Sequence, residues 1–92
     1  MKINPGRFTI RREWLYEDQE LARAILKDVI VWRAEFGIAT DGIEYQGLHP
    51  DFAEIEHKRY ACLEFPHYEP MVELRQIAPH QSKAFFVGWR KA

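Results

Sequence analysis

The stretch from Leu21 to Phe36 reads LARAILKDVIVWRAEF and decides the fold that the sequence predicts. At about 100° of rotation per helical residue, its large apolar residues share one stripe. The stripe comprises Leu21, Ala22, Ile25, Leu26, Val29, Trp32 and Phe36. Glu17 and Asp18 precede it, where acids suit the positive end of a helix, and Gly37 follows as a natural stop. We therefore predict one helix that buries this stripe, with Trp32 as its largest side chain.

Two residues of the same stretch do not fit the stripe. Ile30 and Val31 fall near the opposite face of the predicted helix, beside Arg23 and Lys27. One interpretation is that a loop or terminus of the same domain covers them. The other is a partner surface, and a small apolar patch there would suit a two-fold self-contact in which antiparallel helices cross near Ile30. A homodimer through Arg23, Lys27, Ile30 and Val31 is therefore a candidate.

The segments on either side of this stretch predict strands. Residues 8–16 alternate, with Phe8, Ile10 and Trp14 on one side, although Arg12 interrupts that side. Turn and proline signals separate further predicted strands over residues 43–48, 59–65, 71–78 and 84–89. The order is β-α-β-β-β-β. We therefore predict an α+β fold with a single helix packed across one face of a four- to five-stranded antiparallel sheet.

Length and composition indicate one ordered domain. The chain has 92 residues, which is too short for two independent cores. It is 47% hydrophobic and 29% charged, which is typical of a globular protein. No uninterrupted apolar run exceeds four residues, so the sequence predicts no membrane span and no signal peptide. A cytoplasmic location is the expectation that follows, and the single cysteine, Cys62, cannot form an internal disulfide.

The net charge of −1 hides an uneven distribution. Residues 41–73 carry eight acids and two bases, whereas residues 74–92 carry four bases and no acid. Tyrosines and a phenylalanine lie among the acids, and such a surface combines electrostatic steering with rigid contact area. The sequence thus predicts binding to a protein partner with a basic surface. The candidate contact residues are Asp41, Glu44, Tyr45, Asp51, Phe52, Glu54, Glu56, Tyr68 and Glu69.

Nucleic-acid binding is the alternative. Basic residues near the two ends, with aromatics near the C-terminus, would supply phosphate contacts and stacking surfaces if the first and last strands are neighbours. These residues are Arg7, Arg11, Arg12, Lys83, Phe85, Phe86, Trp89, Arg90 and Lys91. The chain lacks an aromatic RNA-binding motif, a helix-turn-helix pattern and an excess of positive charge, so this alternative ranks second.

Signals for catalysis or metal binding are weak. The segment His49–His57, with His67 and Glu69 further on, contains groups that could hold a metal, but their spacing matches no recognised site. A solvated acidic loop is the favoured interpretation. Cys62 lies between Ala61 and Leu63 in an apolar stretch, which favours a buried thiol. We therefore predict no catalytic residue, no metal and no cofactor.

Together these patterns favour a non-enzymatic protein-binding module. A short reading frame that begins at Met1, with a globular composition and no catalytic motif, is typical of phage and mobile-element products that inhibit a host protein. Anti-CRISPR proteins, which block a host defence, are one class of such products. This expectation concerns general type, and no motif in the sequence matches a family.

Overall fold

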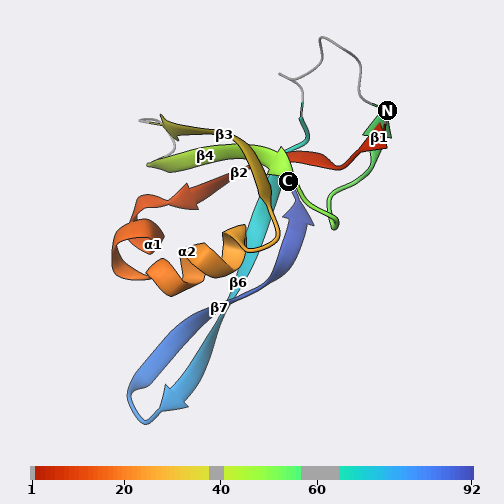
Figure 1. Cartoon of the computed structure of the whole chain (residues 1–92). Helices are drawn as coiled ribbons and strands as arrows, with labels where there is room; N and C mark the ends of the chain where they lie inside the picture. Colours follow the sequence, from red (N-terminus) through yellow and green to blue (C-terminus); the bar gives the residue numbers. More distant parts are fainter. Residues whose placement is uncertain (1, 38–40, 57–64) are drawn as a thin grey trace.

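The computed structural model describes residues 2–37, 41–56 and 65–92 (Figure 1). Two short helices and seven strands make up the described chain. In chain order they are β1 (Lys2–Ile3), β2 (Pro5–Arg11), α1 (Arg12–Glu17), α2 (Gln19–Leu26), β3 (Ile30–Gly37), β4 (Gly42–Leu48), β5 (Ile55–Glu56), β6 (Tyr68–Ala78) and β7 (Gln81–Lys91).

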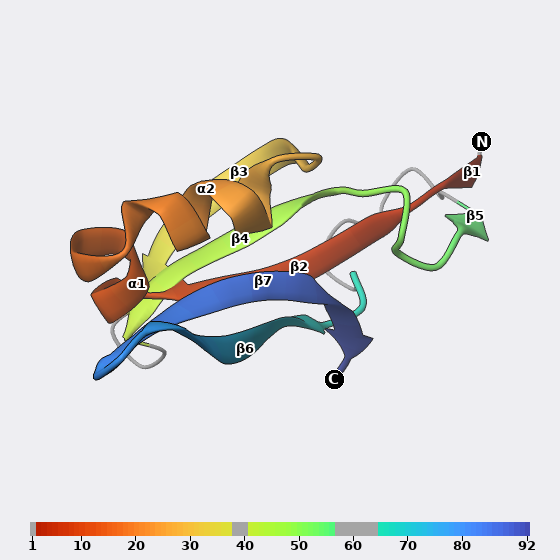
Figure 2. The same ribbon diagram turned by 90° about the horizontal axis from the view of Figure 1, so that it is seen from below.

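The strands form three antiparallel sheets. One has the order β2-β4-β3, the second is the β6–β7 hairpin, and the third is the short pair β1-β5. A single parallel bridge between Arg7 and His67 brings β6 beside β2, and the Arg7 amide donates to the Pro66 carbonyl at 2.9 Å. The hairpin therefore continues the first sheet at one end. Figure 1 shows its far end extending past α2, and Figure 2 shows the helices on one side of the strands.

The predicted long helix is wrong in its second half. Helix α2 ends at Leu26, and residues 30–37 form strand β3, which pairs with β4. Val29, Ile30 and Val31 are consecutive β-branched residues, which favour a pleated strand over a helix, and the β3–β4 pairing supplies the backbone partners. Trp32 is consequently 53% exposed instead of buried, with its ring 5.4 Å from that of Phe65.

The first predicted strand also ends early. Strand β2 stops at Arg11, and α1 begins at Arg12, the residue that interrupts the apolar alternation. Asp18 then starts a second helix, because its carboxylate accepts a hydrogen bond from the Leu21 amide at 3.1 Å. The chain is thus α+β with antiparallel pairing, as predicted, but residues 2–37, 41–56 and 65–92 contain two helices and three sheets instead of one of each.

The other predicted strands agree with the structure where it is described. Strand β4 confirms the prediction over residues 43–48, and β6 and β7 contain the segments 71–78 and 84–89 and extend beyond them. Of the segment 59–65, residues 59–64 lie outside the described residues.

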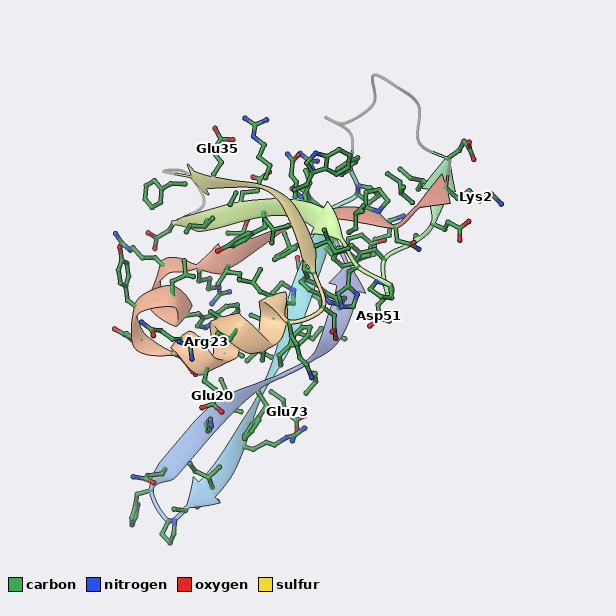
Figure 3. The ribbon with its side chains drawn as sticks, viewed as in Figure 1. Lys2, Glu20, Arg23, Glu35, Asp51 and Glu73 are labelled. Atoms are coloured by element: carbon green, nitrogen blue, oxygen red, sulfur yellow. The ribbon has the colours of Figure 1, made fainter. Side chains whose placement is uncertain are left out.

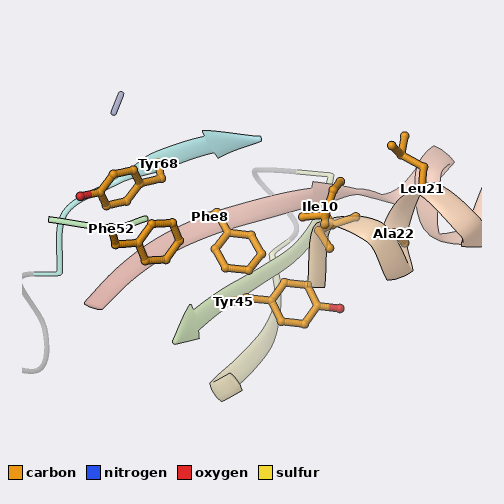
Figure 4. Close-up of a cluster of buried hydrophobic side chains, with 8 residues drawn as sticks. Phe8, Ile10, Leu21, Ala22, Tyr45, Phe52 and Tyr68 are labelled. Atoms are coloured by element: carbon orange, nitrogen blue, oxygen red, sulfur yellow. The ribbon is translucent and has the colours of Figure 1, made fainter. Parts of the chain in front are cut away.

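The core is an aromatic cluster that joins the sheets to α2 (Figure 4). Its buried members are Phe8, Ile10, Leu21, Ala22, Ile25, Tyr45, Phe52 and Tyr68. Phe52 comes from the loop between β4 and β5 and is only 2% exposed. Its ring stacks on Tyr68 at 4.2 Å and meets Trp89 edge-on at 4.9 Å. Phe52 therefore links the hairpin to the β2-β4-β3 sheet through ring contacts that stabilise both.

Hydrogen bonds hold the Phe52 loop in place. The Phe52 amide donates to the His49 carbonyl at 3.0 Å, and the Asp51 amide donates to His49 Nδ1 at 2.9 Å. Asn4 donates its side-chain amide to the Phe52 carbonyl, and the Ala53 amide donates to the Tyr68 hydroxyl at 2.8 Å. The loop is thus anchored to β6 and to the chain just before β2.

Glycine at position 6 makes room for the Phe52 ring. A Cβ atom placed on Gly6 would lie 2.7 Å from two carbons of that ring and 2.8 Å from the Tyr68 ring. These distances are shorter than van der Waals contact allows, and the Phe52 ring is buried, so it has little room to move. A side chain at position 6 would therefore push the Phe52 ring out of its place.

We expect Gly6→Ala to lower the free energy of unfolding by about 1–3 kcal/mol, because one methyl group overpacks the cluster. Urea denaturation followed by tryptophan fluorescence measures the loss. In a Phe52→Leu background the added cost of Ala at position 6 should be smaller, since the two nearest ring carbons are gone. Equal costs in both backgrounds would show that the Phe52 ring is not what excludes a side chain at position 6.

Candidate functional site

The predicted acidic surface is divided among separate parts of the molecule. Asp41 precedes β4, whereas Asp51, Glu54 and Glu56 follow it, and β4 spans about 20 Å between them. Glu44 lies on β4 itself, and Glu69 lies on β6. The run of acids in the sequence therefore does not form one patch in space, and Figure 3 shows Asp51 apart from Lys2, the ion-pair partner of Glu54.

Several of these acids have basic neighbours. Asp41 lies 3.2 Å from Arg12, Glu54 lies 3.8 Å from Lys2, and Glu69 pairs with Arg90. All of these groups are largely exposed, so each ion pair contributes little to stability. The pairs nevertheless reduce the charge that the acids present to a partner.

The aromatic residues assigned to the partner surface are core residues. Tyr45, Phe52 and Tyr68 are 8%, 2% and 7% exposed. Tyr45 stacks on Phe8 of the neighbouring strand, and Phe52 stacks on Tyr68. Their prediction as contact residues is wrong because a ring with large apolar area is buried wherever the fold offers a closed cluster.

The predicted self-association surface is divided as well. Arg23 lies on α2 and Lys27 follows it, whereas Ile30 and Val31 begin strand β3. A dimer of crossing helices near Ile30 is therefore wrong in its geometry. Ile30 and Val31 are nevertheless 69% and 45% exposed, so neither a loop nor a terminus among the described residues covers them.

The histidine segment forms no metal site within the described residues. His49 is buried and its Nδ1 accepts the Asp51 amide, and no group of three or more His, Cys, Asp and Glu side chains in residues 2–37, 41–56 and 65–92 is placed to hold a metal ion. His57 and Cys62 lie outside the part of the chain that is described.

A groove runs between α1 and the β6–β7 hairpin, and we call it the α1–β6 groove. Its volume is about 640 Å³. Apolar and charged residues line it together, and three of the lining side chains are charged. The lining residues are Arg11, Trp14, Glu69, Pro70, Met71, Val72, Leu74, Ala84 and Arg90.

The fold places these residues together for local reasons. Because α1 begins directly after β2, Trp14 lies near the end of that strand, where the Arg11 guanidinium sits 5.2 Å from the indole centroid. The β6–β7 register sets Glu69 opposite Arg90. On β6, Leu74 is 73% exposed and Met71 is 38% exposed. The groove therefore combines an aromatic wall, exposed aliphatic side chains and two arginines.

The groove contains some of the residues that the sequence singled out and others that it did not. Glu69 was predicted to contact a partner, and Arg11 and Arg90 were predicted for nucleic-acid binding. The other basic candidates are dispersed: Lys83 pairs with Glu20 at 2.8 Å, and Arg12 pairs with Asp41. Trp14, Met71 and Leu74 carry no sequence signal for a site, because alternating apolar residues also describe an ordinary buried strand face.

Comparison of the chain with protein-family models, with curated protein sequences and with solved structures found no match. Within the described residues, no helix has the length and apolar character needed to cross a membrane.

Burial raises the pKa of the Tyr45 phenol above its ordinary value of 10.0. The neutral phenol is favoured in the folded state, so this contribution to stability is fully present below pH 10.0 and is lost as the pH rises through the folded-state pKa. We expect the free energy of unfolding to fall more steeply as the pH rises above 10.0 in the wild type than in Tyr45→Phe. Tyr16→Phe, at a tyrosine that is 78% exposed, is the control and should follow the wild type. Parallel curves for wild type and Tyr45→Phe would contradict this role.

Proposed function

We propose that the protein acts by stoichiometric binding of another protein, and that the α1–β6 groove receives an extended segment of that partner. The observation that carries the proposal is the exposure of Leu74 and Met71 beside Trp14 in a groove of about 640 Å³. Grooves of this size with apolar walls and a few charged groups are typical of binding sites. Exposed apolar side chains gathered in a groove are also more informative than the same residues scattered singly.

The backbone of β6 supports an extended occupant. Strand β6 pairs with β7 on one side, and on the other side the one bridge among the described residues joins Arg7 to His67, just before β6 begins. The rest of that edge therefore offers backbone donors and acceptors to an added strand, as in binding by β-augmentation. Side chains of the added strand would reach Trp14, Met71 and Leu74.

The charges at the groove favour an occupant with apolar residues and at least one acid. Two arginines and one acid line the groove; Arg90 pairs with that acid, Glu69, and Arg11 lies 3.6 Å from Glu13, so an acid of the occupant would compete for exposed guanidinium groups. The acids at 51–56 lie outside the groove lining, and contact with a basic surface there stays a separate prediction. We propose that the protein is an inhibitor from a phage or mobile element. It would block a host defence protein by binding it, with no catalytic step of its own.

We expect Met71→Glu with Leu74→Glu to weaken binding of the partner at least about tenfold, because charges then face an apolar segment. The partner is isolated by affinity capture, and its dissociation constant is measured for each variant. Ile77→Gln is the matched control, since Ile77 is 56% exposed on the same strand but does not line the groove. If the double variant keeps its affinity for the partner and the triple variant Asp51→Lys/Glu54→Lys/Glu56→Lys loses affinity, the partner binds the acidic loop. That result would contradict binding in the groove.

Nucleic-acid binding remains a second candidate because Arg11 and Arg90 line the same groove beside Trp14. If it operates, the wild type should shift single-stranded or double-stranded nucleic acid in a gel at low salt, and Arg11→Ala with Arg90→Ala should abolish the shift. Arg75→Ala is the control, since Arg75 is exposed on the same hairpin and outside the groove lining. Absence of a shift by the wild type at low salt would dispose of this candidate.

A further inference from the structure

A second pocket adjoins the α1–β6 groove, close to the bridge that joins β2 to the start of β6, and we call it the Arg7 pocket. Its volume is about 250 Å³, and its lining includes the polar side chains of Arg7, Thr9, His67 and Glu69. Glu69 and Pro70 line both this pocket and the α1–β6 groove. The pocket and the groove are therefore neighbours along β6, and one extended segment can reach both.

Arg7 is held in place at this pocket without an acid partner among the described residues. Its backbone amide donates to the Pro66 carbonyl at 2.9 Å, and its side-chain Nε donates to the Phe65 carbonyl at 2.8 Å. The residue opposite it on β4 is the uncharged Gln46. A guanidinium that is fixed through Nε still has two terminal nitrogens that can donate to a carboxylate. Arg7 is therefore suited to bind an anionic group that enters the pocket.

A second arginine of β2 lies on the same face of the strand. Arg7 and Arg11 alternate with the buried Phe8 and Ile10, so both arginines point away from the core. Arg7 lines the Arg7 pocket and Arg11 lines the α1–β6 groove. The four steps of extended chain between them cover about 13 Å. An extended segment beside β2 covers the same length in four residues, so two acids at that spacing reach both arginines.

The acids near the two arginines do not prevent this contact. Glu69 pairs with Arg90, which offsets its charge. Glu13 lies 3.6 Å from Arg11, and both side chains are largely exposed, so their contact is weak and an acid of the occupant can replace it. The two arginines therefore favour an acidic occupant over a basic one.

We propose that the segment bound in the α1–β6 groove carries two acids four residues apart, whose carboxylates bind Arg7 and Arg11. This inference rests on the proposed function, because it names the chemistry of the segment that the groove receives. Arg7 is the stronger contact, since its guanidinium is already fixed by the bond to the Phe65 carbonyl and loses less freedom on binding. The side chains of the segment that meet Met71 and Leu74 are apolar.

Peptides of different acid spacing test the proposal without any change to the protein. Capped, labelled peptides of leucine and threonine carry two glutamates four positions apart, two glutamates three positions apart, or glutamine in place of both glutamates of the first. Fluorescence anisotropy at one salt concentration gives their dissociation constants. The first peptide binds at least about tenfold more tightly than the others, because a spacing of three places the acids on opposite faces of an extended chain and glutamine carries no charge.

Protein variants identify the two arginines as the binding groups. Arg7→Gln and Arg11→Gln each weaken binding of the first peptide at least about tenfold. Arg23→Gln makes the same chemical change and is the control, because Arg23 is an exposed residue of α2 that lines neither the pocket nor the groove. Its affinity for the peptide equals that of the wild type.

The outcomes separate this inference from the proposed function. If all three peptides bind equally and Met71→Glu with Leu74→Glu abolishes their binding, the groove receives a segment without help from acids, and only the inference is overturned. If the first peptide loses affinity in Arg7→Gln but not in Met71→Glu/Leu74→Glu, the groove is not used and both proposals fail. Absence of binding by every peptide overturns the inference, and the captured partner then tests the groove alone. Displacement of the first peptide by single-stranded DNA at a lower concentration than by unlabelled peptide assigns the arginines to phosphate binding and also overturns the inference.

Discussion

The packing of the Phe52 ring against Tyr68 and Trp89 is the interaction on which the rest of the structure depends. This side chain from a loop joins the β6–β7 hairpin to the β2-β4-β3 sheet, next to the direct contact of Phe8 with Trp89 at 4.7 Å. Among the described residues the two units share one backbone bridge. The absence of a side chain at Gly6 is the condition for this contact, because the ring occupies the space that a Cβ atom would need. Burial of the cluster therefore positions the hairpin, and the hairpin forms one wall of the α1–β6 groove.

The division of the strands also leaves the proposed binding groove accessible. Among the described residues, strand pairing leaves most of one side of β6 without a neighbouring strand. Met71 and Leu74 are exposed on that strand, and they line the α1–β6 groove together with Trp14. The proposed occupant would therefore meet an open strand edge and exposed apolar side chains in one place.

Sequence reasoning succeeded where a pattern is local. The alternation in residues 43–48 and in the C-terminal segments predicts strands that the structure confirms, and the α+β class with antiparallel pairing follows from them. It failed over residues 30–36 because Trp32 and Phe36 fit the helical stripe, whereas Ile30 and Val31, which do not fit it, suit a strand. The β-branched residues at 29–31 favour a strand, and pairing with β4 settles the choice. A local pattern does not report tertiary contacts, and for this reason the sequence did not indicate that Trp14 and Leu74 line a groove.

The sequence by itself determined the antiparallel α+β class and the uneven distribution of charge, since composition and short-range periodicity are properties of neighbouring residues. The tertiary structure alone decided which aromatics are core and which side chains face solvent. Tyr45 and Tyr68 are buried, whereas Trp32 is half exposed, although all three are comparable in size and apolar area. Burial depends on contacts between residues far apart in the chain, such as Phe52 with Trp89, and those contacts exist only once the sheets have been brought together.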